Sequence, residues 1–236
     1  VFGAGSNLLF DDEGFRGLVI RLKSEGLKVE GERITVDAGV MSAKVVLAAA
    51  KAGLTGLEAW NGLPGTVGGA VYGNAGCFGN QMQDIVESIQ VMDARKSEFL
   101  SKSDFLIILK NSECEFSYRD SVFKRHSEWI ILSATLKLKK GDPKESQKLI
   151  GEYSKKRVET QDIGSKCAGC IFKNVEWSRK DIHKSDLCRK FPELKQFSDK
   201  PNIPAAFLMD QLDLKGVKIG AAVISRRHAN YFINTG

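Results

Sequence analysis

A glycine-dense segment restricts the folding of this chain more than any other feature. Seven of the 19 residues from 61 to 79 are Gly, in a chain of 236 residues with 23 Gly and only 5 Pro. Glycine loses the most conformational entropy on folding, so this density is costly unless the backbone must approach something closely. A tight turn needs one or two glycines. We therefore expect residues 63–76 to lie against an extended ligand with a ring system and a pyrophosphate.

A shorter motif, Gly3-Ala4-Gly5-Ser6-Asn7, follows the apolar residues at the start of the chain. Its glycines let backbone N–H groups form a nest for phosphate oxygens, and Ser6 and Asn7 add side-chain donors. The third glycine of the Rossmann fingerprint is absent and no helical pattern follows, so a Rossmann site is not expected. A plain turn between strands is the alternative interpretation.

Composition indicates a folded protein and excludes several classes. Hydrophobic residues make up 42% and charged residues 27%, which argues against disorder and fibres. No run approaches the roughly 18 apolar residues of a membrane span. The net charge of +6 suits a partner that carries phosphates or carboxylates, and equally a nucleic acid. The Lys-rich stretch 144–157 offers only Tyr153 for base stacking, which disfavours nucleic acid. Five irregularly spaced cysteines favour a reducing compartment, and we expect the cytoplasm.

Hydrophobic periodicity predicts mixed helices and strands with a boundary near residue 162. The predicted helices cover 41–52, 143–158 and 205–212. The predicted strands cover 1–2, 18–22, 34–36, 85–92, 105–109, 129–138, 170–174, 217–224 and 231–234. No internal repeat or low-complexity tract is present.

Five motifs together identify a family resemblance. They are GAGSNLL, GLPGTVGGAVYGNAGCFG, FSYRDSVFK, AGCIFKN and AAFLMDQLDLKGVKIGAAVIS…HANYFINTG, in this order from residue 1 to residue 236. The chain resembles the UDP-N-acetylenolpyruvoylglucosamine reductases, flavoproteins that complete UDP-N-acetylmuramate for bacterial peptidoglycan. The resemblance implies an α+β fold, with a vanillyl-alcohol-oxidase/PCMH-type FAD-binding domain over 1–162 and a smaller α+β substrate-binding domain over 163–236. The short spacing between Tyr118 and Cys170 resembles the compact second subgroup of the family.

The resemblance also implies FAD and NADPH as cofactors. The enzyme reduces the enolpyruvyl group of a UDP-sugar by delivering hydride to C3 and a proton to C2. Partners are then small molecules, with no nucleic acid or membrane, and the protein is expected to be a monomer. The residues expected to hold FAD are Gly3, Ala4, Gly5, Ser6, Asn7, Leu8, Pro64, Gly65, Thr66, Gly68, Gly69, Asn74 and Gly76.

Two residues are expected to carry the chemistry. Arg119 would bind the substrate carboxylate, because a guanidinium forms two parallel hydrogen bonds with a carboxylate and stays charged. The alternative is a surface arginine paired with Asp120. Cys170 stands where the family usually has a proton-donating serine, and a thiol with a pKa near ~8.5 is a better acid than an alcohol. The alternatives for Cys170 are a small buried apolar residue, or a metal or redox pair with Cys167; no second zinc-spaced pair is present.

The resemblance places further residues near the substrate: Tyr118, Lys173, Asn174, Lys215, His228 and Asn230. Lys215 suits the nucleotide pyrophosphate as a mobile point charge. His228 could equally be a satisfied core histidine.

Two departures from the family concern the ends of the chain. The family's C-terminal catalytic glutamate has no match in residues 163–236, where Glu176 and Glu193 lie in a charged stretch. The sequence also opens on Val1 with the strand and glycine motif, so we expect a fragment trimmed at both ends, whose activity is not assumed. Two other functions stay open at this point: another FAD-dependent oxidoreductase of the same fold, and a non-catalytic nucleotide-binding or nucleic-acid-binding fragment.

Overall fold

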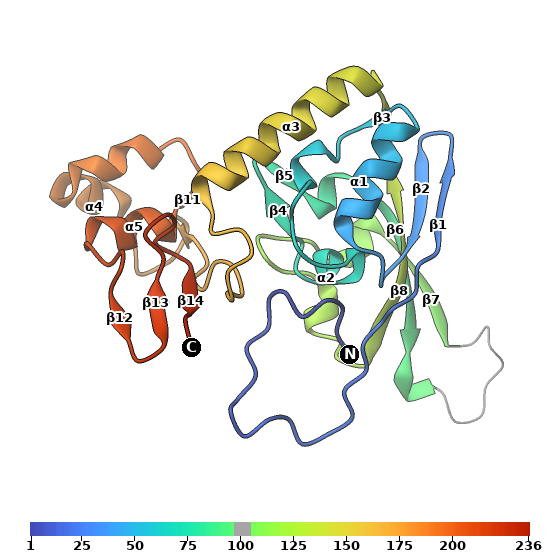
Figure 1. The fold of residues 1–236 in the computed structure, drawn as a ribbon, viewed down its shortest axis with the longest axis horizontal. Helices are drawn as coiled ribbons and strands as arrows, with labels where there is room; N and C mark the ends of the chain where they lie inside the picture. The colour runs from blue at the N-terminus through green and yellow to red at the C-terminus, as the bar shows by residue number, and fades with distance from the viewer. Residues whose placement is uncertain (97–104) are drawn as a thin grey trace. The chain divides into compact units, whose positions relative to one another are not determined.

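The chain divides into two compact units, Val1–Lys156 and Arg157–Gly236 (Figure 1). The computed structural model describes residues 1–96 and 105–236. The assignment of residues 1–162 and 163–236 to a cofactor domain and a substrate domain stays a prediction.

The first unit is built on an antiparallel sheet in the order β1-β2-β8-β6-β7. Its strands are β1 (Leu27–Glu30), β2 (Arg33–Asp37), β6 (Val86–Asp93), β7 (Leu106–Lys110) and β8 (Trp129–Lys137). Strand β2 alternates exposed and buried residues, and Ile34 and Val36 are 0% and 1% exposed. This period of two commits one face of the sheet to the core.

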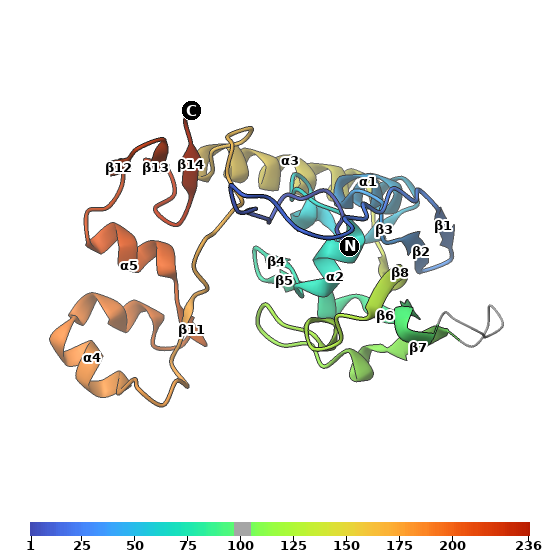
Figure 2. The same ribbon diagram turned by 90° about the horizontal axis from the view of Figure 1, so that it is seen from below.

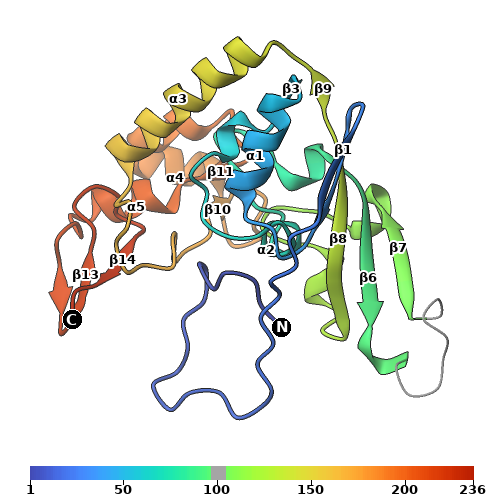
Figure 3. The ribbon, with the colours of Figure 1, turned by 45° about the vertical axis from the view of Figure 1, so that its right-hand side comes forward.

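Helices α1 (Ser42–Lys51) and α2 (Val67–Tyr72) lie on one face of this sheet (Figure 3). Helix α1 agrees with the predicted helix and ends before Gly53, whose φ of +67° suits glycine. Helix α2 was not predicted, because six residues rich in Gly show no periodicity. It forms because Val67, Ala70 and Val71 are buried, while Gly68 presses on Ala38, where a Cβ atom would come within 2.8 Å.

Short elements connect these parts of the first unit. They are β3 (Leu54–Thr55), η1 (Glu58–Trp60), β4 (Gly76–Cys77), β5 (Asn80–Gln81), η2 (Met82–Asp84), η3 (Ala94–Lys96), η4 (Asn111–Cys114), η5 (Val122–Lys124) and β9 (Lys139–Lys140). Helix α3 (Pro143–Thr160) follows, close to the predicted helix and largely exposed.

Residues 3–20 form no helix or strand and run as an irregular loop (Figure 2). The predicted strand over 18–22 is wrong: only Arg21 pairs, through a parallel bridge to Phe2. Leu9 and Leu18 are 91% and 82% exposed, so burial does not hold this segment in a sheet.

The second unit packs small elements around two small apolar clusters. Its elements are β10 (Val175–Glu176), α4 (Lys184–Lys190), η6 (Pro192–Phe197), β11 (Asn202–Ile203), α5 (Ala205–Gln211), β12 (Lys218–Ile219), β13 (Ala222–Ile224) and β14 (Phe232–Asn234). One cluster centres on Phe197 and the other on Met209. The strand predicted over 170–174 is reduced to one bridge, Cys170 to Tyr231, because the backbone leaves the pairing after two residues. The strand predicted over 217–224 is a hairpin that turns at Gly220, whose φ is +56°.

Candidate active site

The two glycine motifs meet in the first unit. Ser6 Oγ donates a hydrogen bond to the carbonyl of Pro64 at 3.3 Å. A Cβ atom on Gly3 would collide with Thr66 Oγ1, and one on Gly65 would lie 3.0 Å from Ser6 Oγ. Glycine at positions 3 and 65 therefore allows the two loops to touch. The two motifs lie about 60 residues apart in the sequence, and no contact between them was predicted.

The first glycine loop presents open hydrogen-bond donors. Within the part of the chain that the structure describes, the backbone N–H groups of residues 3–8 donate to no protein acceptor. Gly5 has a φ of +74°, which turns successive N–H groups toward one side, as in an anion-binding nest. These features fit the pyrophosphate of a dinucleotide.

The second loop is instead anchored to the protein. The N–H groups of Val67 and Gly68 donate to the carbonyls of Val40 and Ala38 at 2.9 Å each. Thr66 caps α2 by accepting from the N–H of Gly69 at 3.4 Å. The loop therefore offers a small-residue surface for a flat ligand, while the start of α2 serves the fold.

Arg119 lies at the tip of a tight turn with a left-handed φ of +57°. The N–H and carbonyl of Ser117 pair with those of Asp120 at 3.1 Å each, which closes the turn. Nη2 of Arg119 donates to the carbonyl of Gly76 at 2.9 Å, and the guanidinium carbon lies 5.6 Å from the ring centroid of Tyr118. These contacts hold the guanidinium beside the second glycine loop.

The structure argues against Asp120 as the partner of Arg119. Asp120 pairs with Arg125 at 2.7 Å, and Arg125 also pairs with Glu115 at 2.8 Å. Burial alone would raise the pKa of the Asp120 carboxyl. The hydrogen bond and charge of the Arg125 guanidinium contribute to outweighing burial, and the pKa of Asp120 lies below its ordinary value. Among residues 1–96 and 105–236, no carboxylate lies within ion-pair distance of Arg119. Arg119 thus stays available to a carboxylate ligand.

Asn74 is a fully buried polar residue near this turn, as is Ser121. Its side chain is 0% exposed, and its Nδ2 donates to the carbonyl of Ser117 at 2.9 Å and to Gln83 Oε1 at 2.8 Å. Its Oδ1 accepts from the N–H of Gln83 at 3.0 Å. The hydrogen bonds of this amide go to protein groups and lend no support to a direct contact between Asn74 and a cofactor. That contact stays a prediction.

Cys170 is an exposed residue of the second unit, and Asn230 holds the two residues that follow it. Asn230 is 1% exposed; its Nδ2 donates to the carbonyl of Phe172 at 2.8 Å and its Oδ1 accepts from the Phe172 N–H at 2.9 Å. The carbonyl of Asn230 accepts from the N–H of Ile171 at 3.0 Å. Three hydrogen bonds therefore fix the two residues after Cys170, and its exposure contradicts the buried apolar alternative.

Tyr231 lies beside Cys170, and His228 lies beside Tyr231. Tyr231 is the bridge partner of Cys170, so their side chains share one face. Burial, with smaller contributions from charge on Cys170 and Cys167, raises the pKa of Tyr231 to about 12. The rings of His228 and Tyr231 lie 4.4 Å apart, and burial lowers the pKa of His228. Tyr231 thus stays protonated beside Cys170, and the ring of His228 packs against Tyr231.

A buried serine shapes this corner of the second unit. Ser225 Oγ donates a short hydrogen bond to Asp162 and accepts from the N–H groups of Arg227 and His228 at 2.9 Å each. Ser225 and Asp162 were missed by the sequence analysis. The signal was weak: a serine directly before the basic pair Arg226-Arg227, and this serine's acidic partner lies 63 residues away.

The remaining residues with a predicted substrate role are placed separately within the second unit. Lys173 is exposed and forms no ion pair within the described part of the chain. Asn174 accepts from the N–H of Ala205 at 3.1 Å at the start of α5. Lys215 pairs with Asp210 at 2.6 Å. Contact of these residues with a substrate stays a prediction.

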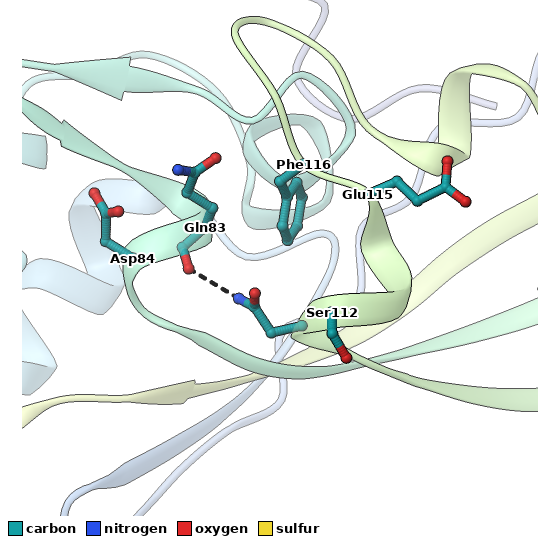
Figure 4. Close-up of a pocket in the computed structure, with 6 residues that line it drawn as sticks. Gln83, Asp84, Ser112, Glu115 and Phe116 are labelled. Atoms are coloured by element: carbon teal, nitrogen blue, oxygen red, sulfur yellow. Dashed lines mark hydrogen bonds between the residues drawn. The ribbon is translucent and has the colours of Figure 1, made fainter.

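A cavity of about 300 Å³ opens elsewhere in the first unit, and no predicted site residue lines it (Figure 4). Its lining residues are Gln83, Asp84, Asn111, Ser112, Glu115 and Phe116. Asp84 already accepts from the N–H of Gln81 at 2.7 Å, and Glu115 pairs with Arg125. The carboxylates at this cavity are therefore engaged by the protein itself.

Residues 1–96 and 105–236 hold no cluster of three or more His, Cys, Asp or Glu side chains suited to a metal ion. None of the helices found in those ranges combines the length and apolar character required to cross a bilayer.

Comparisons with known proteins agree on one family. Residues 1–99 match the FAD binding domain family, and residues 161–236 match the family described as the UDP-N-acetylenolpyruvoylglucosamine reductase C-terminal domain. The reductase of that name from Solibacter usitatus is 36% identical over 100% of this chain and 71% of its own length. The one from Bacillus subtilis is 35% identical over 100% of this chain and 68% of its own length. The crystal structure of the Thermus caldophilus reductase superposes with a TM-score of 0.69 at 30% identity, covering 99% of this chain and 73% of that one.

Proposed function

The chain belongs to the UDP-N-acetylenolpyruvoylglucosamine reductase family, and on that premise we propose that Arg119 and Cys170 carry its chemistry. The enzyme is an FAD-containing oxidoreductase of peptidoglycan synthesis with the predicted α+β fold. The family matches favour this function over a different oxidoreductase or a non-catalytic binder. The observation that best supports the site is the guanidinium of Arg119, which lacks an acidic partner in the described residues and lies beside a glycine-built cradle.

The residues that would hold FAD are those of the two touching glycine loops. The open N–H groups of residues 3–8 would donate hydrogen bonds to the pyrophosphate oxygens, and the flat ring system would lie against the small residues around Gly65. Bound FAD would supply hydride to C3 of the enolpyruvyl group after reduction by NADPH. The fit supports assigning FAD to the predicted cofactor domain, residues 1–162, which contains the first unit.

Arg119 would bind the substrate carboxylate with two parallel hydrogen bonds. As hydride reaches C3, negative charge develops on C2 and the carboxylate, and a fixed cation there lowers the energy of that charge. The contact with Gly76 supports this role, because it positions the guanidinium before substrate arrives.

Cys170 would then donate the thiol proton to C2, leaving a thiolate that recovers a proton from water. Its exposure and the three hydrogen bonds that fix residues 171–172 support a donor held in one place. The substrate side would be completed in residues 163–236 by Lys173, Asn174, Lys215, His228 and Asn230. Lys215 would leave its ion pair with Asp210 and bind the pyrophosphate of the substrate.

None of the five cysteines, all of which lie in the described residues, forms a disulfide, and we infer a cytoplasmic compartment, where thiols are ordinarily kept reduced. We propose a monomer whose partners are small molecules only.

Anaerobic spectroscopy of the purified holoenzyme tests the function. NADPH should bleach the flavin absorbance, and the enolpyruvyl UDP-sugar should restore it with formation of UDP-N-acetylmuramate. A bleached flavin that this substrate leaves unchanged would contradict the proposal.

A further inference from the structure

We propose that Asn74 is a positioning residue whose buried amide holds Arg119 in its working orientation. The inference rests on the proposed role of Arg119 in binding the substrate carboxylate. Asn74 lies at the end of α2, 43 residues from Ser117, yet its amide joins the two segments through the 2.9 Å hydrogen bond to the Ser117 carbonyl. Positioning Arg119 accounts for an amide whose hydrogen bonds all go to protein groups, which a contact with a ligand would not.

The hydrogen bond from Asn74 reaches the foot of the Arg119 turn. The carbonyl of Ser117 already accepts from the N–H of Asp120, and a carbonyl has two lone pairs, so Asn74 occupies the second. Between Ser117 and Asp120, Arg119 adopts a φ of +57°, a left-handed conformation that is unfavourable for any residue with a Cβ atom. A strained conformation persists only when its surroundings fix it, and Asn74 supplies that fixation.

Asn74 also holds the surface on which the guanidinium rests. Its own φ is +39°, and the chain then leads through Ala75 to Gly76, whose carbonyl accepts from Nη2 of Arg119 at 2.9 Å. The Asn74 carbonyl lies 3.5 Å from Nη1. One residue therefore sets both the backbone beneath Arg119 and the carbonyls that its guanidinium meets.

Gln83 completes the buried network. It donates its N–H to Asn74 Oδ1 and accepts from Asn74 Nδ2, so the amide cannot rotate without breaking both bonds. Asn111 offers a control that touches the same network without reaching the Arg119 turn: its Nδ2 donates to the carbonyls of Gln83 and Val86 at 2.8 Å each, so its removal tests whether loosening around Gln83 alone explains an effect.

A double-mutant cycle on the holoenzyme tests the proposal. Asn74→Gly deletes the amide at a left-handed position that glycine tolerates, so the backbone conformation is retained. The variants are Asn74→Gly, Arg119→Ala, their combination, and Asn111→Ala. The readouts are flavin content, the rate of flavin reduction by NADPH, the single-turnover rate of flavin reoxidation by the enolpyruvyl UDP-sugar, and the calorimetric affinity for that sugar.

We expect Asn74→Gly to lower the single-turnover rate and the affinity by about tenfold or more, while flavin reduction by NADPH changes less than about twofold. In the Arg119→Ala background, Asn74→Gly should cause no further loss, because the amide acts through Arg119. Asn111→Ala should stay within about twofold of the parent. Asn74→Asp, which keeps the shape but loses both N–H donations, serves if the glycine variant fails to fold, and the same pattern is expected.

Losses that multiply in the double variant would overturn the positioning role, as would an equal loss in Asn111→Ala. An Arg119→Ala variant with unchanged affinity and rate would overturn the proposed function of Arg119 itself, and the cycle separates the two failures.

Discussion

Arg119 rests on Gly76: its Nη2 donates to the Gly76 carbonyl at 2.9 Å, and a Cβ atom at position 76 would lie 3.3 Å from its Nη1. Glycine at this position therefore leaves the space that the guanidinium occupies. The same Cβ atom would lie 3.0 Å from the carbonyl oxygen of Asn80, a residue of β5 that pairs with Cys77 of β4.

Gly76→Ala should displace Arg119 and weaken substrate binding. We expect the KM for the enolpyruvyl UDP-sugar to rise by about tenfold, since overpacking at a tight contact costs about 1–3 kcal/mol. Steady-state kinetics and flavin content check this. Gly73→Ala is the control from the same loop, because a Cβ atom there meets nothing closer than 3.7 Å and its φ is −97°. Equal effects of the two substitutions would rule out a specific contact with Arg119.

Asn230→Ala should release the segment after Cys170. Three hydrogen bonds from Asn230 hold residues 171 and 172, and its side chain supplies two of them. We expect the rate of substrate reduction to fall by about tenfold, with NADPH still reducing the flavin at the parent rate. Asn234→Ala, on an exposed residue of β14, provides the comparison. If Asn230→Ala reduces substrate as fast as the parent, Asn230 does not position the donor.

Glu58 should make the stability of the first unit depend on pH. Burial alone would raise the pKa of Glu58, but hydrogen bonds from Ser146, Thr55 and the N–H of Gly56 outweigh it and hold the pKa below the ordinary value. A carboxyl group with a depressed folded pKa stabilises the fold above its unfolded pKa of about 4.3, and this contribution is lost as the pH falls through the folded pKa.

Glu58→Gln should therefore lower the free energy of unfolding by about 1–3 kcal/mol at pH 7 and by less at pH 3. Urea unfolding at both pH values measures the difference. Exposed Glu159 provides the control as Glu159→Gln. A loss for Glu58→Gln that is the same at both pH values would show that the charge of Glu58 does not contribute.

His228 should titrate below its ordinary range. Burial is the main cause of its lowered pKa, and the nearby charge of Lys215 adds to it. The unfolded chain then binds more protons than the folded one below a pH of about 6.5, so His228 costs stability as the pH falls through that value. Nuclear magnetic resonance of the imidazole should place its midpoint below about 6.5, the value of an unperturbed imidazole. A midpoint at or above that value would refute the buried, neutral state.

The sequence was sufficient for much of the fold and for the chemical types at the site. Periodicity located α1, β6 and β8, because each places a long apolar face on one core. Glycine density located the loops that meet at Gly3 and Thr66, because close backbone approach requires glycine there. Helix α2 stayed hidden, since six residues with two adjacent glycines carry no helical period.

The partnerships within the site could not be predicted, because they join residues that lie far apart in the chain. Asn74 reaches Ser117, and Ser225 reaches Asp162, only after the fold brings them together. Nothing local predicts that the amide of Asn74 bonds to protein groups instead of a ligand, and the left-handed backbone of Arg119 has no signature in the sequence. The side chains of Asn74 and Asn230 are almost fully buried whereas Lys173 is exposed, and burial depends on the complete fold.

The most direct measurement compares the two half-reactions in Cys170→Ala and Arg119→Ala under anaerobic single-turnover conditions. We expect both variants to retain flavin and to be reduced by NADPH at the parent rate. Reoxidation by the enolpyruvyl UDP-sugar should slow by about 100-fold or more in each, because the proton donor or the carboxylate-binding cation is gone. Cys188→Ala, on a partly buried thiol of the second unit, should reoxidise like the parent. Parent-like reoxidation in both Cys170→Ala and Arg119→Ala would contradict the assigned chemistry, as would equal slowing of both half-reactions.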